Sequence, residues 1–483
     1  MDMQPLYLKV SGHYRQAIQS GVLTPGERMP SVRALMRLHK VSLSTAALAC
    51  HTLEDEGLLE ARPRSGYFVL RKRRADIQPI SEPEPGRPLD AAQYVGIHDR
   101  VSDYVAKCDR HPLVANLAAA YGSPEMYPSE ALKNAATRAL RQHPQLLVSA
   151  VDSPRDSPLR AVLARRALEA GMQLSASDVV VTHGCIEALN IALRAVAQPG
   201  DTIAVESPTY YGLLQILESL GLRALEIPTS PKAGISIEAL ELAFQTHDNI
   251  RAVVVMPNFH NPLGSVMADQ DKERLVRLCE RQHVALIEDD TYGALTHDDV
   301  PLRAAKSWDT TGCVIYCASL RKTLAPGLRL GWMTGGRWQA RIQMLKYAQS
   351  RTNEALAQMA VAQFMALSAY DRHLARLRRL LNAQRDEMAE AIARHFPAGT
   401  RLTVPNGSML LWVEMPGDAK AQKVFDAALL QGIRVAPGSL FSNSSRFDNY
   451  LRISCGHPFS DKADDALRKL AAIVAAQVAA KPV

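Results

Sequence analysis

ASLRKTLAPGLRLGW, residues 318–332, places a lysine directly after an apolar run and an arginine seven residues beyond that lysine. The run itself, CVIYCAS at 313–319, has the length and composition of a strand that is buried on both faces. A lysine that leaves the end of such a strand is desolvated and gives up its proton readily, so Lys322 is a candidate nucleophile. The planar guanidinium of Arg329 suits a phosphate dianion.

Apolar runs of the same kind recur along the chain and alternate with amphipathic stretches. They are VVVT at 179–182, AVVVM at 252–256, VALIED at 284–289 and GWMTGG at 331–336. Alternation of buried strands with crossover helices is typical of an α/β domain on a mainly parallel sheet. After about Tyr370 the pattern changes to long charged helices followed by short strands. We therefore expect a large α/β domain over residues 111–370 and a small C-terminal α+β lobe over residues 371–483.

The first 70 residues have the pattern of a winged helix-turn-helix. Ser31 is the expected N-cap of the second helix, and the segment LLEARPRSGYFVL at 58–70 is typical of two strands joined at a basic tip. The stretch that follows is rich in charge, proline and glycine, so we expect a linker over residues 71–110. The expected helices cover residues 7–20, 31–39 and 45–56.

The positive charge of the chain is concentrated in this N-terminal module. The whole sequence has a formal net charge of +7, and residues 1–74 hold 12 lysines and arginines against 6 acidic residues. A basic module joined to a nearly neutral body suggests a polyanion partner for the module alone. Double-stranded DNA is the partner that fits the helix-turn-helix pattern.

The composition argues against a membrane protein and against a metal site. No stretch approaches the roughly 20 apolar residues that span a bilayer, and the first residues lack the pattern of a signal peptide, so we expect a cytoplasmic protein. The seven cysteines are an odd number and are scattered without CxxC pairs. We expect reduced thiols and no metal.

Further polar groups follow the apolar runs, as a pyridoxal 5'-phosphate site requires. Asp289 can pair with a protonated pyridine nitrogen, and Tyr292 can donate to the phenolate oxygen. Asn261 offers an amide at the end of another strand, and Tyr210 offers a ring for stacking. The backbone N–H groups of residues 184–186 can hold a phosphate at a helix N-terminus. Each feature alone is common in structural roles, but together they predict a cofactor site.

Both parts of the sequence resemble known families. PGERMPSVRAL at 25–35, VSLSTA at 41–46 and LEDEGLLEARPRSGYFV at 53–69 resemble the GntR-type winged helix-turn-helix. The motifs between ESPTYYG at 206–212 and YLRISCG at 450–456 resemble those of fold-type I, class I/II aminotransferases. The tandem resembles the MocR/GabR-type regulators.

This resemblance implies site residues for each part. Lys322 would form a Schiff base with pyridoxal 5'-phosphate, and Gly122 and Arg452 would contact an amino acid or amine effector, with Arg452 clamping its carboxylate. The implied cofactor contacts are Gly184, Cys185, Ile186, Tyr210, Asn261, Asp289, Tyr292, Ser319, Lys322 and Arg329. The implied DNA contacts are Arg28, Ser31, Arg33, Ser42, Ser44, Thr45, Arg64 and Gly66.

The sequence departs from these families at several positions. Arg321 stands where a serine is common before the lysine, and Cys185 and Ile186 replace a commoner Ser-Gln pair, so fewer side chains are expected on the phosphate. The segment AVDSPRDSPLRAVL at 150–163 lacks the Tyr and Gly that are usual there, and that Tyr reaches the phosphate of the partner subunit. Leu43 replaces a common arginine, which affects base readout.

Together these observations predict a homodimeric DNA-binding transcription regulator. Its aminotransferase-like domain would sense an amino acid, an amine or the cofactor itself, and closure of the C-terminal lobe would alter how the DNA-binding domains meet an operator. A working aminotransferase with an accessory DNA-binding module is the main alternative, because Arg452 can hold a substrate carboxylate. A third alternative is a DNA-binding protein that uses the fold without a cofactor.

Overall fold

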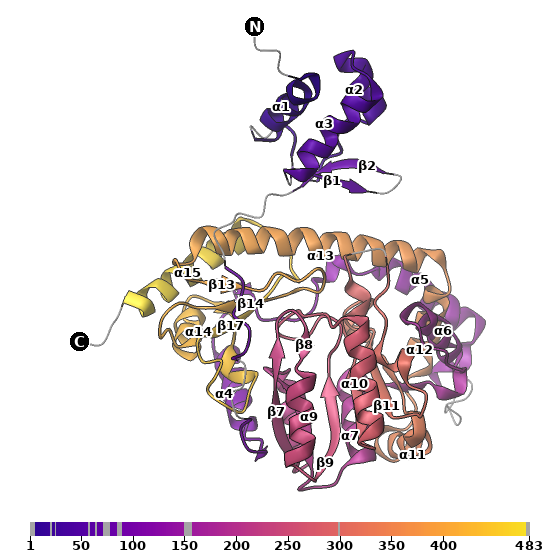
Figure 1. Cartoon of the computed structure of the whole chain (residues 1–483). Coiled ribbons are helices and arrows are strands. Elements are labelled where there is room, and N and C mark those ends of the chain that lie inside the picture. The colour runs from indigo at the N-terminus through magenta and orange to yellow at the C-terminus, as the bar shows by residue number, and fades with distance from the viewer. Residues whose placement is uncertain are drawn as a thin grey trace. The chain divides into compact units, whose positions relative to one another are not determined.

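The structure is a computed structural model of the chain. It describes residues 5–19, 22–24, 26–56, 58–62, 65–70, 78–84, 89–148, 157–297 and 300–479. The chain divides into two compact units, Met1–Asp76 and Ile77–Val483, and each is described by itself (Figure 1).

The first unit is a domain of three helices and a two-stranded wing. Ser31 accepts a hydrogen bond from the backbone N–H of Ala34 and caps the second helix, as the sequence predicts. The third helix begins earlier than the predicted residue 45, because Ser42 caps it by accepting from the N–H of Thr45. The elements are α1 (Leu6–Gln19), α2 (Val32–His39), α3 (Leu43–Asp55), β1 (Leu59–Arg62) and β2 (Gly66–Val69).

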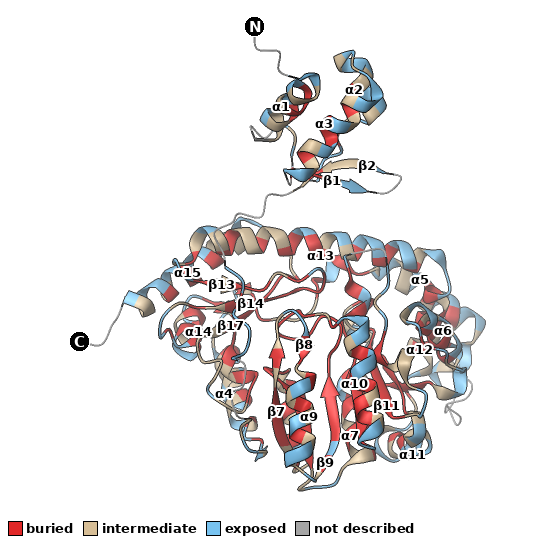
Figure 2. Cartoon of the chain, viewed as in Figure 1, coloured by how far each residue is buried: buried red, intermediate tan, exposed pale blue. Residues whose placement is uncertain are grey.

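The second unit is built on a nine-stranded mixed sheet whose central strands are parallel. In sheet order the strands are β3 (Gln93–Tyr94), β7 (Arg223–Ser230), β6 (Thr202–Ser207), β9 (Ile250–Val255), β10 (Ala285–Asp289), β11 (Val314–Ser319), β12 (Gly331–Thr334) and β5 (Val180–Thr182), and β8 (Gly234–Ile235) pairs with β7. Strands β6, β10 and β11 are buried along their whole length. The apolar runs at 284–289 and 313–319 predict this for β10 and for β11, which is labelled in Figure 2.

A smaller four-stranded sheet forms the C-terminal lobe of this unit. Its strands, in order, are β13 (Arg401–Leu402), β14 (Leu410–Glu414), β17 (Tyr450–Ser454) and β16 (Ala436–Pro437), and a separate parallel pair joins β15 (Ile433–Arg434) to β4 (Ala115–Asn116). The longest helix, α13 (Ser368–His395), runs along the unit from this lobe to α5 and α6 (Figure 1). The other helices are α4 (His98–Arg110), α5 (Ser129–Gln142), α6 (Pro158–Ala167), α7 (Cys185–Val196), α8 (Tyr211–Ser219), α9 (Ile237–Thr246), α10 (Asp269–Arg281), α11 (Gln339–Ser350), α12 (Ala355–Met365), α14 (Ala421–Leu429) and α15 (Asp461–Ala479).

The second half of the stretch expected as a linker is folded. β3 joins the central sheet, and α4 buries Val101 and Cys108 although most of its residues are polar. These apolar positions recur at helical spacing, but charged neighbours hide the pattern in the sequence. Residues 71–77 and 85–88 lie outside the described residues. No helix in the described ranges is long and apolar enough to cross a membrane.

Candidate functional site

The carboxyl ends of the parallel strands face a cavity of about 340 Å³ in the second unit. In open α/β sheets this is the edge at which ligands bind, because the loops that leave the strands diverge there. The cavity brings together residues that are far apart in the sequence. Its lining includes Gly184, Cys185, Ile186, Tyr210, Asn261, Asp289, Tyr292, Ser319, Lys322, Arg329 and Arg452.

Lys322 lies just beyond β11, where the apolar run ends. Its Nζ donates a hydrogen bond of 2.6 Å to the backbone carbonyl of Ala120, and it lies 5.6 Å from the ring centroid of Tyr292. Burial, together with the positive charges of Arg321 and Arg452, lowers the pKa of the Lys322 amine to about 7. A large fraction of this amine is therefore neutral, and so nucleophilic, near neutral pH.

Asp289 ends β10 and is buried. Its Oδ1 accepts hydrogen bonds from the hydroxyl of Thr291 at 2.6 Å and from the thiol of Cys185 at 3.2 Å. Burial raises the pKa of the Asp289 carboxyl. The thiol of Cys185 thus points to this carboxylate, and only the backbone of Cys185 remains as a donor to a phosphate. Sequence reasoning missed Thr291, although a hydroxyl two residues after an aspartate commonly bonds it.

Arg452 lies in β17 of the small lobe and is only 2% exposed. Its Nη1 donates to Oδ1 of Asn261 at 3.2 Å, and its Nη2 donates to the carbonyl of Ala118 at 2.7 Å. The guanidinium carbon lies 5.1 Å from the ring centroid of Phe441. Two of its nitrogens are therefore held in place, and a third, Nε, is buried without a hydrogen-bond partner among the described residues.

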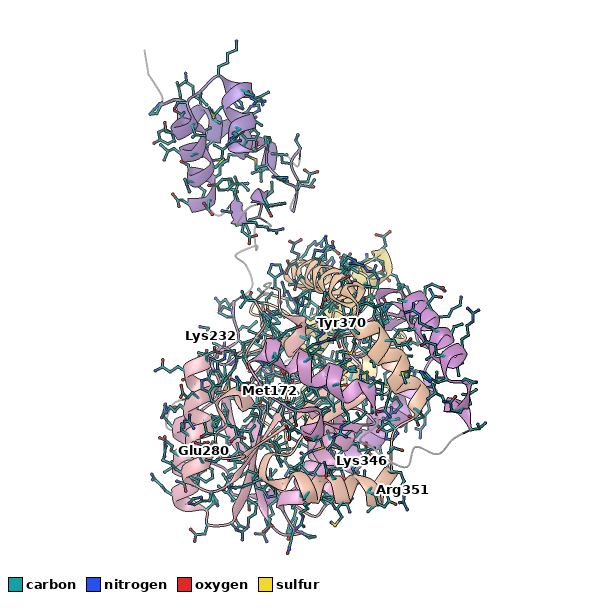
Figure 3. The ribbon with its side chains drawn as sticks, turned by 90° about the vertical axis from the view of Figure 1, so that its right-hand side faces the viewer. Met172, Lys232, Glu280, Lys346, Arg351 and Tyr370 are labelled. Atoms are coloured by element: carbon teal, nitrogen blue, oxygen red, sulfur yellow. The ribbon has the colours of Figure 1, made fainter. Side chains whose placement is uncertain are left out.

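The turn before α7 forms a backbone cradle at the cavity. Gly184 has φ 81° and ψ 179°, a conformation that only glycine adopts readily, and a Cβ added there would meet nothing within 4 Å. Glu187 accepts from the backbone N–H of His183 and pairs at 2.9 Å with the buried Lys346, which is labelled in Figure 3, so this turn is anchored. The cradle is open and faces the cavity, as a phosphate site requires.

The remaining predicted cofactor residues differ in exposure. Ser319 is buried, and its Oγ accepts from the backbone N–H of Arg321 at 3.1 Å. Arg329 is exposed and has a left-handed backbone, with φ 50°. Tyr210 and Tyr292 both line the cavity. Burial raises the pKa of each phenol, so both hydroxyl groups stay protonated.

The segment 116–121 forms one wall of the cavity, and sequence reasoning singled out only the residue that follows it, Gly122. The carbonyl of Ala118 accepts from Arg452, and that of Ala120 accepts from Lys322. Tyr121 lies under the guanidinium of Arg321. Backbone carbonyls carry no sequence signal, so no pattern could have found them. Gly122 is not among the residues that line the cavity, and its N–H donates to the phenol oxygen of Tyr127 at 2.9 Å.

In the first unit, the predicted DNA contacts gather at the N-terminus of α3. The hydroxyl of Ser42 lies 2.9 Å from that of Ser44 and 2.8 Å from that of Thr45, while Leu43 is 56% exposed. Ser42 is thereby committed to the helix cap as well as to this cluster.

Two of the predicted basic contacts, Arg33 and Arg28, lie at α2 and beside the wing. Arg33 is exposed at the start of α2. Arg28 pairs with Phe68 of the wing, and a Cβ added at Gly66 would lie 3.5 Å from Nε of Arg28. Arg64, at the predicted tip, lies outside the described residues, as does the 149–156 segment that contains most of the departure from the aminotransferase pattern.

Comparison with known proteins places both parts of the chain in families. Residues 6–69 match bacterial regulatory proteins of the gntR family, and residues 122–470 match aminotransferases of class I and II. The chain is 36% identical over 94% of its length, and 96% of the relative's, to the uncharacterized HTH-type transcriptional regulator YjiR of Escherichia coli (strain K12). It is 33% identical to a second such regulator of that organism, YdcR, over 97% of this chain and 98% of the relative.

Solved aminotransferases share the fold of the second unit. An α-aminoadipate aminotransferase, LysN of Thermus thermophilus, has a TM-score of 0.71 at 24% identity and covers 78% of this chain and 95% of its own. A kynurenine aminotransferase of Pyrococcus horikoshii has a TM-score of 0.73 at 24% identity, over 79% of this chain and 95% of its own. The chain therefore belongs to the MocR/GabR-type family, in which a gntR-family helix-turn-helix precedes a class I and II aminotransferase domain.

Proposed function

We propose that this protein is a homodimeric, cytoplasmic transcription regulator that binds double-stranded DNA and senses a small amine, an amino acid or pyridoxal 5'-phosphate. The observation that carries the proposal is the amine of Lys322, with a pKa of about 7, in one cavity with Asp289 and Arg452. The chain that builds this cavity also contains a helix-turn-helix. The names of two relatives support the proposal, because both are called HTH-type transcriptional regulators.

The donor set of the cavity fits pyridoxal 5'-phosphate. When bound, this cofactor supplies an aldehyde carbon that amines attack and a ring that withdraws electrons from it. The carboxylate of Asp289 would hold the proton of the pyridine nitrogen, and Tyr292 and Asn261 would donate to the phenolate. The open cradle at Gly184 would hold the phosphate, together with Arg329 and Ser319. Tyr210 would stack on the ring, with the Cys185 and Ile186 backbone beside the phosphate.

Arg452 would select effectors with a carboxylate. Its guanidinium is held by Asn261 and by the carbonyl of Ala118, so little side-chain entropy is lost when a ligand binds. Lys322 would hold the cofactor at its aldehyde carbon. Gly122 would support this wall through the hydrogen bond of its N–H to Tyr127.

A contact between the linker and the small lobe supports coupling to the DNA-binding domain. Gln78 pairs with Arg401 of β13, and the carbonyl of Gln78 accepts from the N–H of Leu402 at 3.0 Å. β13 belongs to the sheet that carries Arg452. Lys232, labelled in Figure 3, pairs with Glu82 of the same segment at 4.0 Å. Movement of the small lobe would therefore pull on the segment that leads to the DNA-binding domain.

For DNA, we propose that α3 enters the major groove with Ser42, Ser44 and Thr45 at its leading end. Arg28, Arg33 and Arg64 would contact phosphates, with Ser31 and Gly66 close to the backbone. Two-fold symmetry of a homodimer would match an operator with two half-sites. In domain terms, residues 1–70 would bind DNA, while 111–370 and 371–483 would form the two lobes of the sensor.

The first experiment is an absorbance titration of the purified protein with pyridoxal 5'-phosphate. We expect a visible band in the wild type that is absent from Lys322→Ala and Lys322→Arg, because only a neutral amine at this position captures the aldehyde. Lys133→Ala, at an exposed helical lysine, is the matched control and keeps the band. Candidate amines are then added, and DNA affinity is measured by fluorescence anisotropy. Absence of the band in the wild type would leave only the DNA-binding part of the proposal.

A working aminotransferase is the second candidate function. The same pair, Lys322 and Arg452, favours it, because transamination needs a proton shuttle and a held carboxylate. One relative is named a 2-aminoadipate transaminase of Thermus thermophilus, at 27% identity over 72% of this chain and 87% of its own. Sustained formation of a keto acid from an amino acid would establish this function, whereas a single stoichiometric spectral change would support the sensor.

A further inference from the structure

The cavity holds more positive charge than the proposed function uses. Among the described residues that line it are four arginines, Arg321, Arg329, Arg434 and Arg452, against two carboxylates, Asp109 and Asp289, and the amine of Lys322 lies among them. The proposed roles use two of the arginines, since Arg329 would face the phosphate and Arg452 would face the effector carboxylate. Arg321 and Arg434 are left without an assigned anion.

The wall segment contacts four of these residues. The carbonyl of Ala118 accepts from Arg452, the carbonyl of Ala120 accepts from Lys322, and Tyr121 packs against Arg321. The backbone of Asn116 pairs with that of Arg434 in the β4–β15 ladder.

Among the described residues, the guanidinium of Arg434 donates a hydrogen bond, whereas that of Arg321 makes a ring contact only, and Nε of each is buried without a hydrogen-bond partner there. Nη2 of Arg434 donates at 2.5 Å to the carbonyl of Cys108, near the C-terminus of α4, where the helix dipole is negative. The guanidinium of Arg321 instead lies 5.1 Å from the ring centroid of Tyr121, a contact that fixes its position but satisfies no N–H group. Its Nε is buried without a hydrogen-bond partner in the part of the chain that the structure describes.

We infer that Arg321, held in place by Tyr121, binds an oxyanion in this cavity. The inference rests on the proposed function and adds a ligand group to it. The oxyanion has two possible sources, the phosphate of the cofactor and a second carboxylate on the side chain of an acidic amino acid effector. Either source supplies a pair of acceptor oxygens to which a guanidinium can donate two hydrogen bonds. In the first case Arg321 replaces the phosphate contacts that Cys185 and Ile186 lack, and in the second it makes the sensor selective for acidic amino acids.

The test compares Arg321→Gln with the wild type in two titrations. The first measures the ratio of the affinities for pyridoxal 5'-phosphate and pyridoxal, and this ratio cancels any effect of the substitution on the reactivity of Lys322. The second measures the ratio for L-glutamate and L-norvaline, which have the same chain length but differ in the second carboxylate. A fall of about tenfold or more in either ratio supports the inference and identifies the source, since one charge-assisted hydrogen bond has about that effect.

Controls separate this role from general damage. Arg337 is an exposed arginine whose guanidinium lies 4.2 Å from the ring centroid of Trp338, outside the cavity, so Arg337→Gln removes a similar contact and keeps both ratios. Arg321→Lys restores part of the lost ratio. If Arg321→Gln changes neither ratio, or lowers all four affinities alike, the inference is wrong.

The inference can also be tested apart from the proposed function. Inorganic phosphate and glutarate are added to the cofactor-free protein, and the rise in melting temperature is compared with that caused by chloride and butyrate. We expect a selective rise in the wild type for one of the two oxyanions that Arg321→Gln abolishes. A wild type that lacks the visible band but shows this Arg321-dependent rise contradicts the proposed function and keeps the inference. A wild type that shows the visible band, but whose melting temperature rises as much with Arg321→Gln as without it, supports the proposed function and contradicts the inference.

Discussion

At the scale of single residues, we expect the effector preference to depend on Arg452. Its replacement by glutamine leaves the amide of Asn261 and the carbonyl of Ala118 in place but removes the paired donors for a carboxylate. We expect affinity for amino acids to fall about ten- to a hundredfold, because charge-assisted hydrogen bonds are lost. Amines without a carboxylate should bind as before, and spectral titration measures both. Equal losses for both ligand classes would contradict the assigned role.

The pKa of Lys322 makes cofactor capture depend on pH. Burial and the charges of Arg321 and Arg452 lower this pKa to about 7, and only the neutral amine attacks an aldehyde. The rate of capture should therefore rise about tenfold per pH unit below that value and level off above it. Stopped-flow absorbance with pyridoxal, which lacks a titrating phosphate, measures this profile. A midpoint near the ordinary lysine pKa would show that the amine is not desolvated.

At the scale of elements, the N-cap of α3 allows stability and DNA contact to be separated. Ser42→Ala removes the acceptor for the N–H of Thr45 and should cost the first unit about 1 kcal/mol of unfolding free energy. Ser42→Asp keeps a good cap but places a carboxylate where the DNA backbone would approach. We expect Ser42→Asp to melt like the wild type and to bind DNA much more weakly. Equal DNA affinity for Ser42→Asp and the wild type would exclude this end of α3 from the interface.

At the scale of the whole molecule, residues 78–84 are the first described part of the second unit after the DNA-binding domain. Ile80 is 7% exposed and packs into the core of the second unit, next to Gln78 on the edge of β13. Ile80→Asp places a charge in the core of the second unit and should detach this segment from the core and from β13. We expect the visible band and effector affinity to be unchanged while the effector no longer alters DNA affinity in anisotropy measurements.

Ile80→Val is the control for this prediction, because it keeps an apolar side chain and should keep the effector response. If the effector still alters the DNA affinity of Ile80→Asp as it does in the wild type, the coupling does not pass through the packed segment 78–84. Loss of the visible band in the same variant would instead reveal a folding defect, which circular dichroism detects directly.

Much of the fold could be predicted because its signals are local. Apolar runs of strand length mark β9, β10 and β11, and the cap at Ser31 marks α2. The pattern does not reveal α4, because its two buried side chains are surrounded by charged residues. The predicted start of α3 is two residues late, because the sequence alone assigns Ser42 to the turn rather than to the cap.

The sequence by itself determined the two families and the polar residues at the ends of the strands, since each of these depends on side-chain identity and spacing. Only the tertiary structure decided that the carbonyls of Ala118 and Ala120 hold Arg452 and Lys322, and that the thiol of Cys185 faces Asp289. It also decided that Gln78 pairs with β13. The physical reason is that backbone groups and long-range contacts acquire partners only when distant segments pack together, and no residue pattern within one segment records that packing.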